Sequence, residues 1–201
     1  MEQITIGIGE YYASSVPAVV YTLLGSCVAV CLFDQVNQVG GMNHFLLPGK
    51  ADLKNFNNRA RYGINAMELL INKMMSLGAN RKNIVAKIFG GATVLPKINK
   101  MYHVGAKIVD FTRQFLMNER IKIINQDCGG HDIRKIFFYT ESGNVFLKRV
   151  KNTHFKNVVE QERKWLRIMR KEVAKPGKIE IFEKNVDPDR LSSQVLKNMF
   201  I

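Results

Sequence analysis

A stretch without a single charged side chain, Tyr11–Phe33, is the feature that most constrains how this chain can fold. It has the length of a membrane-spanning helix, but it contains Pro17 and the pair Gly25-Ser26, and acidic rather than basic residues flank it. A spanning helix needs about 20 continuous apolar residues and a basic cytoplasmic flank. The stretch therefore predicts two buried β-strands separated at Gly25-Ser26, and no membrane insertion.

Short apolar segments alternate with two segments of helical period along the first 150 residues. Turn residues bound the apolar segments, and hydrophobic residues at helical spacing mark the helices. The predicted strands are Val19–Leu24, Val28–Phe33, Val39–Leu47, Ile84–Phe89, Ile121–Ile124, Ile136–Thr140 and Val145–Val150. One predicted helix begins near Tyr62 and ends at Gly78, and the other begins at Val104. This mixture predicts an α+β fold with two core helices.

The positive charge of the chain is concentrated near its C-terminal end. Residues 1–49 contain no Lys or Arg, whereas residues 146–184 carry twelve Lys and Arg against five acids, within a net charge of +13. Phe155–Glu172 is predicted as a basic amphipathic helix. We therefore divide the chain into a domain of residues 1–150 and a basic helical extension of residues 151–201. Because no nucleic-acid module accompanies the charge, no nucleic-acid partner is predicted, although a basic nucleic-acid-binding module stays an alternative.

Cysteine content and the N-terminal sequence predict where the protein works. The chain has three cysteines, an odd number, which favours free thiols in a reducing compartment. Its first residues lack the basic segment that export would need. The predicted location is the cytoplasm.

Cys27 and His44 come together in the simplest hairpin that this part of the chain can form. If the turn is centred just after Gln35, the numbers of opposed residues sum to 71, and Cys27 lies opposite His44. Directly opposed residues have Cβ atoms about 4.5–5.5 Å apart on the same face. This register predicts a thiol beside an imidazole, whereas a slip of one residue would separate them.

A cysteine beside a histidine is typical of an activated nucleophile, because the imidazole can take the proton of the thiol. Gly25 and Ser26 leave the backbone before Cys27 uncrowded, so main-chain N–H groups there can bind an oxyanion. Attack on a carboxamide forms a thioester and releases ammonia, and water then yields a carboxylate. The pattern predicts a cysteine-dependent amidohydrolase with Cys27 as nucleophile and His44 as general base.

Each of these residues also has an ordinary structural explanation. A buried cysteine near a strand start is usually a small core residue, and a lone histidine is usually structural or exposed. Cys27, Cys31 and His44 could together bind zinc, but the two cysteines lie two pleats apart and no fourth ligand is near. No metal or other cofactor is therefore predicted, and the structural alternatives stay open beside the catalytic one.

Several segments resemble the CheD family, the chemoreceptor glutamine deamidases of bacterial chemotaxis, in the same order along the chain. The resemblance covers roughly residues 4–150. Its segments are Ile6–Tyr11, the cysteine signature Leu24–Leu32, the histidine motif Gly41–Pro48, Tyr62-Gly63, the double-glycine block Ala86–Ala92, and Asp127–Gly130 with Arg134-Lys135.

The resemblance implies mixed β-sheets in a sandwich flanked by helices, with the basic extension outside it. It implies a catalytic Cys–His pair with a threonine, for which Thr22 is the candidate orienting residue. The implied substrates are glutamines on the cytoplasmic helices of chemoreceptors, and the implied partner is a phosphatase of the CheC type. A non-catalytic adaptor that binds this phosphatase or the receptors is the alternative.

Overall fold

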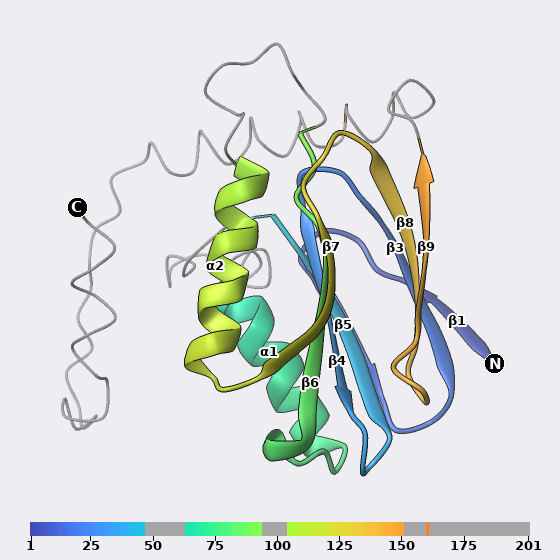
Figure 1. The fold of residues 1–201 in the computed structure, drawn as a ribbon. Coiled ribbons are helices and arrows are strands. Elements are labelled where there is room, and N and C mark those ends of the chain that lie inside the picture. Colours follow the sequence, from blue (N-terminus) through green and yellow to red (C-terminus); the bar gives the residue numbers. More distant parts are fainter. Residues whose placement is uncertain (47–62, 94–103, 151–159, 161–201) are drawn as a thin grey trace, which may run out of the picture.

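The computed structural model describes residues 1–46, 63–93, 104–150 and 160. Two β-sheets face each other, and two helices cover the outer face of one sheet (Figure 1). The predicted α+β sandwich flanked by helices is confirmed for these residues. The predicted basic extension, residues 151–201, lies outside the described residues except for Glu160.

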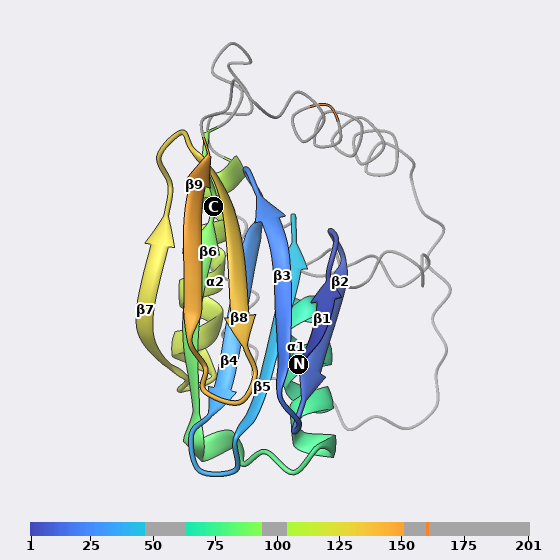
Figure 2. The ribbon, with the colours of Figure 1, turned by 90° about the vertical axis from the view of Figure 1, so that its right-hand side faces the viewer.

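The four-stranded sheet, nearest the viewer in Figure 2, has the strand order β1-β3-β8-β9. β1 runs parallel to β3, and the other neighbours are antiparallel. β8 and β9, both predicted as strands, form a hairpin. The strands are β1 (Glu2–Thr5), β3 (Ala18–Leu24), β8 (Ile133–Tyr139) and β9 (Val145–Val150).

The five-stranded sheet has the order β2-β5-β4-β6-β7, and only its last pair is parallel. The strands are β2 (Glu10–Ser14), β4 (Val28–Asp34), β5 (Val39–Phe45), β6 (Ile84–Gly90) and β7 (Lys122–Cys128). β7 is longer than the predicted strand because it stays paired with β6 as far as Cys128. Asp127 and Cys128 are therefore the last two residues of β7.

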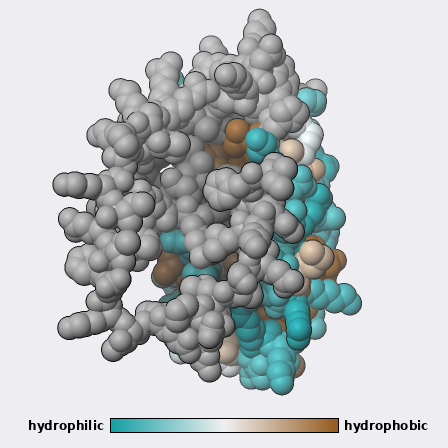
Figure 3. All heavy atoms as spheres, turned by 90° about the vertical axis from the view of Figure 1, so that its left-hand side faces the viewer, coloured by the Kyte–Doolittle hydropathy of each residue, from teal (hydrophilic) through white to brown (hydrophobic). Residues whose placement is uncertain are grey.

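Helices α1 (Gly63–Ser76) and α2 (Val104–Asn118) pack on the five-stranded sheet (Figure 1). The apolar side of α1 is buried, and Gly78, with a φ of 95°, ends it as predicted. A short 3₁₀ turn, η2 (Arg81–Asn83), then leads into β6. On this side of the molecule the described surface is mainly hydrophilic (Figure 3). No described helix is long and apolar enough to cross a membrane.

Residues 28–33 of β4 carry no charge because the strand is covered on both faces. Leu32 lies opposite Gly41, which packs against Leu70 of α1, whereas Phe33 packs against Gly143 of the β8–β9 turn. Val28–Leu32 are at most 1% exposed. A strand covered by helices on one side and by a second sheet on the other needs a continuous apolar run.

The hairpin of β4 and β5 has a different register from the predicted one. Asp34 pairs with Val39, and the numbers of opposed residues sum to 73 rather than 71. His44 lies opposite Ala29, so the predicted direct opposition of Cys27 and His44 is wrong. Because the shift is two residues, every side chain keeps its predicted face of the sheet.

The wider turn is explained by the buried carboxylate of Asp34. It accepts hydrogen bonds from the backbone N–H groups of Val36 (2.9 Å) and Asn37 (3.0 Å), and from that of Asn80 (2.6 Å). Gln38 completes the turn with a left-handed φ of 53°. Burial acts to raise the pKa of Asp34, but the hydrogen bond from the Asn37 side chain (2.8 Å) and those from the backbone outweigh it and hold the pKa below its ordinary value.

Candidate active site

The chain crosses from the four-stranded to the five-stranded sheet at Gly25-Ser26-Cys27, the bend that joins β3 to β4. Gly25 and Cys27 are buried, and Ser26 is half-buried. The N–H of Gly91 donates to the Cys27 carbonyl (2.7 Å), and the N–H of Ala92 donates to the Gly25 carbonyl (2.8 Å). The bend is thus anchored to the residues that follow β6.

His44 points from β5 into the space between the sheets. The preceding Asn43 points toward α1, where its amide donates to the Ala66 carbonyl (3.1 Å) and accepts from the N–H of Val30 (3.1 Å). Successive strand residues face opposite sides, so His44 faces the four-stranded sheet and is 3% exposed. Its Nδ1 lies 2.8 Å from Oγ1 of Thr22 in β3.

The hydroxyl of Thr22 links the His44 ring to the backbone. It donates to the Ile6 carbonyl (2.6 Å), so its oxygen accepts from the N–H at Nδ1 of His44. Tyr21, the residue before it, lies on the opposite face of β3 against the ring of Phe137, 5.8 Å away. These hydrogen bonds assign the proton of the neutral ring to Nδ1 and leave Nε2 unprotonated.

The second ring nitrogen of His44, Nε2, is buried and has no hydrogen-bond partner in the described part of the chain. Burial lowers the pKa of His44 to about 4, and the Ile6 carbonyl acts in the opposite direction. The imidazole is therefore neutral at pH 7, and the lone pair of Nε2 can accept a proton. A buried polar atom without a partner commonly marks a functional site.

Cys27 immediately precedes β4, and the alternation of that strand puts it on the same face as His44. Ala29 is the direct partner of His44, and a residue two positions earlier shares the face of Ala29. Such diagonal neighbours are about 7–8 Å apart, within reach of long or aromatic side chains. The two-residue error in register thus changes the direct neighbour of His44 but leaves Cys27 on the same side.

Folding stability is expected to fall by about 3 kcal/mol as the pH is lowered from about 6.5 to about 4. The pKa of His44 is about 4 in the folded chain, below its ordinary value, so in this window the unfolded chain binds the extra proton. Urea unfolding at a series of pH values measures how the free energy of unfolding depends on pH. His44→Gln should flatten this dependence. An unchanged slope in His44→Gln would contradict the assignment.

The chain is similar to known proteins over most of its length. Residues 46–149 match the family model described as CheD chemotactic sensory transduction. A Chromobacterium violaceum protein named "Probable chemoreceptor glutamine deamidase CheD 2" is 43% identical over 175 residues, 87% of each chain. The chain belongs to the CheD family. A Methylobacillus flagellatus relative of similar name is 39% identical over 178 residues, 87% of this chain and 86% of the relative. One from Shewanella oneidensis is 46% identical over 160 residues, 75% of this chain and 78% of the relative.

The double-glycine block through which the chain resembles CheD proteins packs directly against the bend that carries Cys27. The CheD model match begins at residue 46, so it includes neither Cys27 nor His44. Gly90 has a φ of 111°, and a Cβ there would overlap the carbonyl oxygen of Cys27. A side chain at Gly91 would meet Val109 of α2. Only glycine lets β6 and the bend approach this closely.

Three backbone groups at this site were not predicted from the sequence. They are the carbonyl of Ile6, which holds Thr22, and the N–H groups of Gly91 and Ala92, which hold the bend. A backbone group has no side-chain signature, so the repeated glycine was the only local signal of a close approach. Among the described residues, no three His, Cys, Asp or Glu side chains gather as metal ligands.

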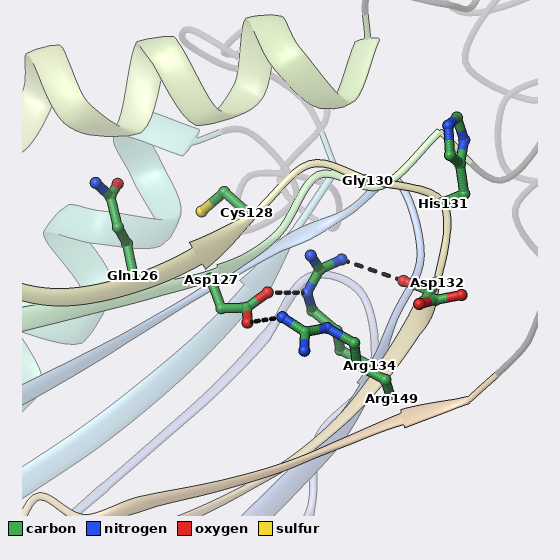
Figure 4. Close-up of a pocket in the computed structure, with 8 residues that line it drawn as sticks. All are labelled: Gln126, Asp127, Cys128, Gly130, His131, Asp132, Arg134 and Arg149. Carbon is green, nitrogen blue, oxygen red and sulfur yellow. Dashed lines mark hydrogen bonds and ion pairs between the residues drawn. The ribbon is translucent and has the colours of Figure 1, made fainter.

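Two surface pockets of about 380 Å³ flank the site without including Cys27 or His44. One, at the end of β7, contains Asp127 and Arg134 (Figure 4). The other, between β1 and β2, contains Ile6 and Glu10, and Glu10 is the strand partner of His44. The β1–β2 pocket adjoins the backbone that holds Thr22 and His44.

Thr22→Val is expected to lower catalytic turnover by about 10- to 100-fold, because it leaves the buried N–H of His44 without its acceptor, at a cost of about 1–3 kcal/mol. The substitution keeps the size and shape of the side chain and removes only the hydroxyl. Thr22→Ser keeps the hydroxyl and is the matched control. Steady-state rates of glutamine conversion compare the three chains, and equal rates for Val and Ser would show that the hydroxyl has no orienting role.

Proposed function

We propose that this chain is a protein-glutamine amidohydrolase that converts specific glutamines of chemoreceptors to glutamates in bacterial chemotaxis. The observation that carries this is the buried pair of Thr22 and His44, whose Nε2 has no partner among the described residues and lies on the face shared with Cys27. Membership of the CheD family supports the reaction class, because the relatives are named chemoreceptor glutamine deamidases.

The reaction follows from the protonation state of His44. Nε2 takes the proton of the Cys27 thiol, and Sγ attacks the carboxamide carbon of the glutamine. The tetrahedral intermediate collapses to a thioester when His44 returns the proton to the leaving nitrogen, which departs as ammonia. Nε2 of His44 then deprotonates a water molecule, which attacks the thioester. This step releases the glutamate carboxylate and restores the thiol.

The backbone of Gly25 and Ser26 is suited to bind the oxyanion that forms during both steps. Their bend is fixed by hydrogen bonds to its carbonyls from Gly91 and Ala92, so its N–H directions do not have to be organised during the reaction. A fixed donor in a buried site stabilises developing charge by about 2.7–4 kcal/mol in other enzymes. No cofactor takes part in this mechanism.

The setting of the reaction follows from the substrates. An enzyme acting on glutamines of the cytoplasmic receptor helices works in the cytoplasm, a reducing compartment that keeps a thiol nucleophile free. Residues 1–150 form the catalytic unit, and the basic extension of residues 151–201 attracts the acidic surface of the receptor helices. A phosphatase of the CheC type is the proposed protein partner.

The test is to incubate the purified chain with cytoplasmic fragments of chemoreceptors and to follow glutamine-to-glutamate conversion by mass spectrometry together with ammonia release. Conversion at specific glutamines is expected, with one ammonia released for each. The same chain alkylated with iodoacetamide should be inactive. A non-catalytic adaptor would bind the fragments but release no ammonia, and that result would exclude the proposed reaction.

A further inference from the structure

Arg134 is a buried arginine on β8 whose contacts lie outside its own sheet. Its side chain is 4% exposed, and its Nε donates to Oδ1 of Asp127 (2.7 Å). Its Nη1 and Nη2 donate to the carbonyls of Asp132 (3.1 Å) and Gly129 (2.7 Å). Figure 4 shows the guanidinium reaching from β8 to the end of β7. All three donor nitrogens are thus engaged in directions that only the planar fork of arginine provides.

The position of Arg134 in the fold connects it to the bend at Cys27. In the four-stranded sheet its backbone pairs with Leu24, the last residue of β3 before the bend. Its side chain binds Asp127, near the end of β7 in the five-stranded sheet, and Gly129, which follows that strand. Arg134 therefore ties the two sheets together at the end of the sandwich where the chain crosses between them.

A series of backbone hydrogen bonds continues from Gly129 to the bend. The N–H of Gly129 donates to the Gly90 carbonyl (2.9 Å) at the end of β6. The next residue, Gly91, donates its N–H to the Cys27 carbonyl (2.7 Å). The Gly130 carbonyl also accepts a hydrogen bond from the N–H of Thr93 (2.8 Å). Thr93 directly follows Ala92, whose N–H binds the Gly25 carbonyl. Two glycine pairs thus lie between the guanidinium and Cys27, with only main-chain contacts linking them.

We propose that Arg134 is a positioning residue that holds the bend of Gly25-Ser26-Cys27 in place, and with it the reach of the Cys27 thiol toward His44. The inference rests on the proposed function, since it assigns Arg134 a role in supporting the nucleophile. Glycines with left-handed φ values, such as Gly90 (111°) and Gly129 (77°), are flexible in the unfolded chain. Arg134 holds the Gly129 carbonyl directly, and the N–H of Gly129 in turn binds the Gly90 carbonyl.

The neighbouring Arg149 provides a matched control. It also forms an ion pair with Asp127, but its side chain is 56% exposed. Exposed ion pairs contribute little to stability. Arg149→Gln removes one positive charge from beside the Asp127 carboxylate and leaves the contact between Arg134 and Gly129 in place. It therefore distinguishes a loss of charge near Asp127 from a loss of the support that Arg134 gives to the bend.

The experiment compares Arg134→Gln, Arg134→Lys and Arg149→Gln with the wild type. A displacement of about 1 Å at a reacting group costs about 100-fold in rate, so Arg134→Gln is expected to lower kcat about 100-fold with KM nearly unchanged. Arg134→Lys keeps the buried charge without the fork and should fall in between. Arg149→Gln should stay within about 2-fold of the wild type. Urea unfolding of each variant gives the folded fraction under assay conditions.

A second measurement does not depend on deamidation. The rate at which iodoacetamide labels Cys27, located by peptide mass spectrometry, is recorded against pH for the folded chains. A thiol moved away from the imidazole should reach half its maximal rate at a higher pH, by about 1 unit, in Arg134→Gln. A merely structural role would lower the folded fraction and leave this profile and kcat per folded chain unchanged, and that result overturns the inference.

The two readouts also separate the failure of this inference from failure of the proposed function. If the wild type converts no glutamine but Arg134→Gln still shifts the labelling profile, the positioning role stands and the reaction assigned to the site is wrong. If the wild type converts glutamine and Arg134→Gln does so equally well, with the wild-type profile, the reaction stands and the positioning role is wrong.

Discussion

Replacing Cys27 with alanine is expected to lower the rate of glutamine conversion by about 10⁴-fold or more. The Cys27 sulfur is the atom that bonds to the substrate carbon in the proposed mechanism, so the covalent route is lost with it. The fold should persist, because alanine fits the buried position and the Gly91 hydrogen bond uses only the Cys27 backbone. Mass spectrometry of receptor fragments measures the conversion, and urea unfolding confirms that the variant is folded.

The other two cysteines provide controls for this substitution. Burial raises the pKa of Cys128 to about 11, and burial raises the pKa of Cys31 still further above its ordinary value. Neither thiol is ionised at pH 7, so neither is expected to act as a nucleophile. Cys128→Ala should keep the rate within about 2-fold. Conversion by Cys27→Ala at the wild-type rate would exclude Cys27 as the nucleophile.

Replacing His44 with glutamine is expected to lower the rate by about 10³-fold or more, because both proton transfers pass through Nε2. Glutamine is the most informative replacement, since its amide N–H can still donate to Oγ1 of Thr22 where Nδ1 does now. Packing between the sheets is therefore largely kept while the base is removed. The rate is measured on the same receptor fragments as for the other variants.

The pH dependence of His44→Gln separates the two roles of the imidazole. At high pH the thiol ionises without a base, so labelling of Cys27 by iodoacetamide should recover in the variant. Glutamine conversion should not recover, because departure of ammonia still needs a proton donor. If conversion recovers in step with labelling, His44 acts only as the base.

Both helices and the strands from β3 onward are largely predictable because each is bounded by signals close to it in the sequence, whereas β1 and β2 are not among the predicted strands. Gly78 ends α1 in the left-handed conformation that its position predicts. The uncharged residues of β4 are buried on both faces, as a continuous apolar run indicates. Such signals act within one or two turns of the chain and need no knowledge of the partner strands.

Strand ends and register are less predictable, because contacts distant in sequence set them. The β4–β5 turn is wider than predicted, since Asp34 is held by the backbone of Asn80 as well as by its own turn. β7 extends through Asp127 because it continues to pair with β6. Neither interaction has a local sequence pattern from which the hairpin register or the strand end could be predicted.

At the candidate site, the sequence by itself determined the chemistry that is available: a cysteine after two small residues, a histidine one hairpin away, and an apolar run that buries both. Only the tertiary structure decided that Thr22 meets His44, that Nε2 is left without a partner in the described part of the chain, and that the Arg134 guanidinium reaches Asp127 in the other sheet. Each of these contacts joins strands of different sheets. They arise when the two sheets pack together, and no pattern within a single strand specifies which residues will face each other across that interface.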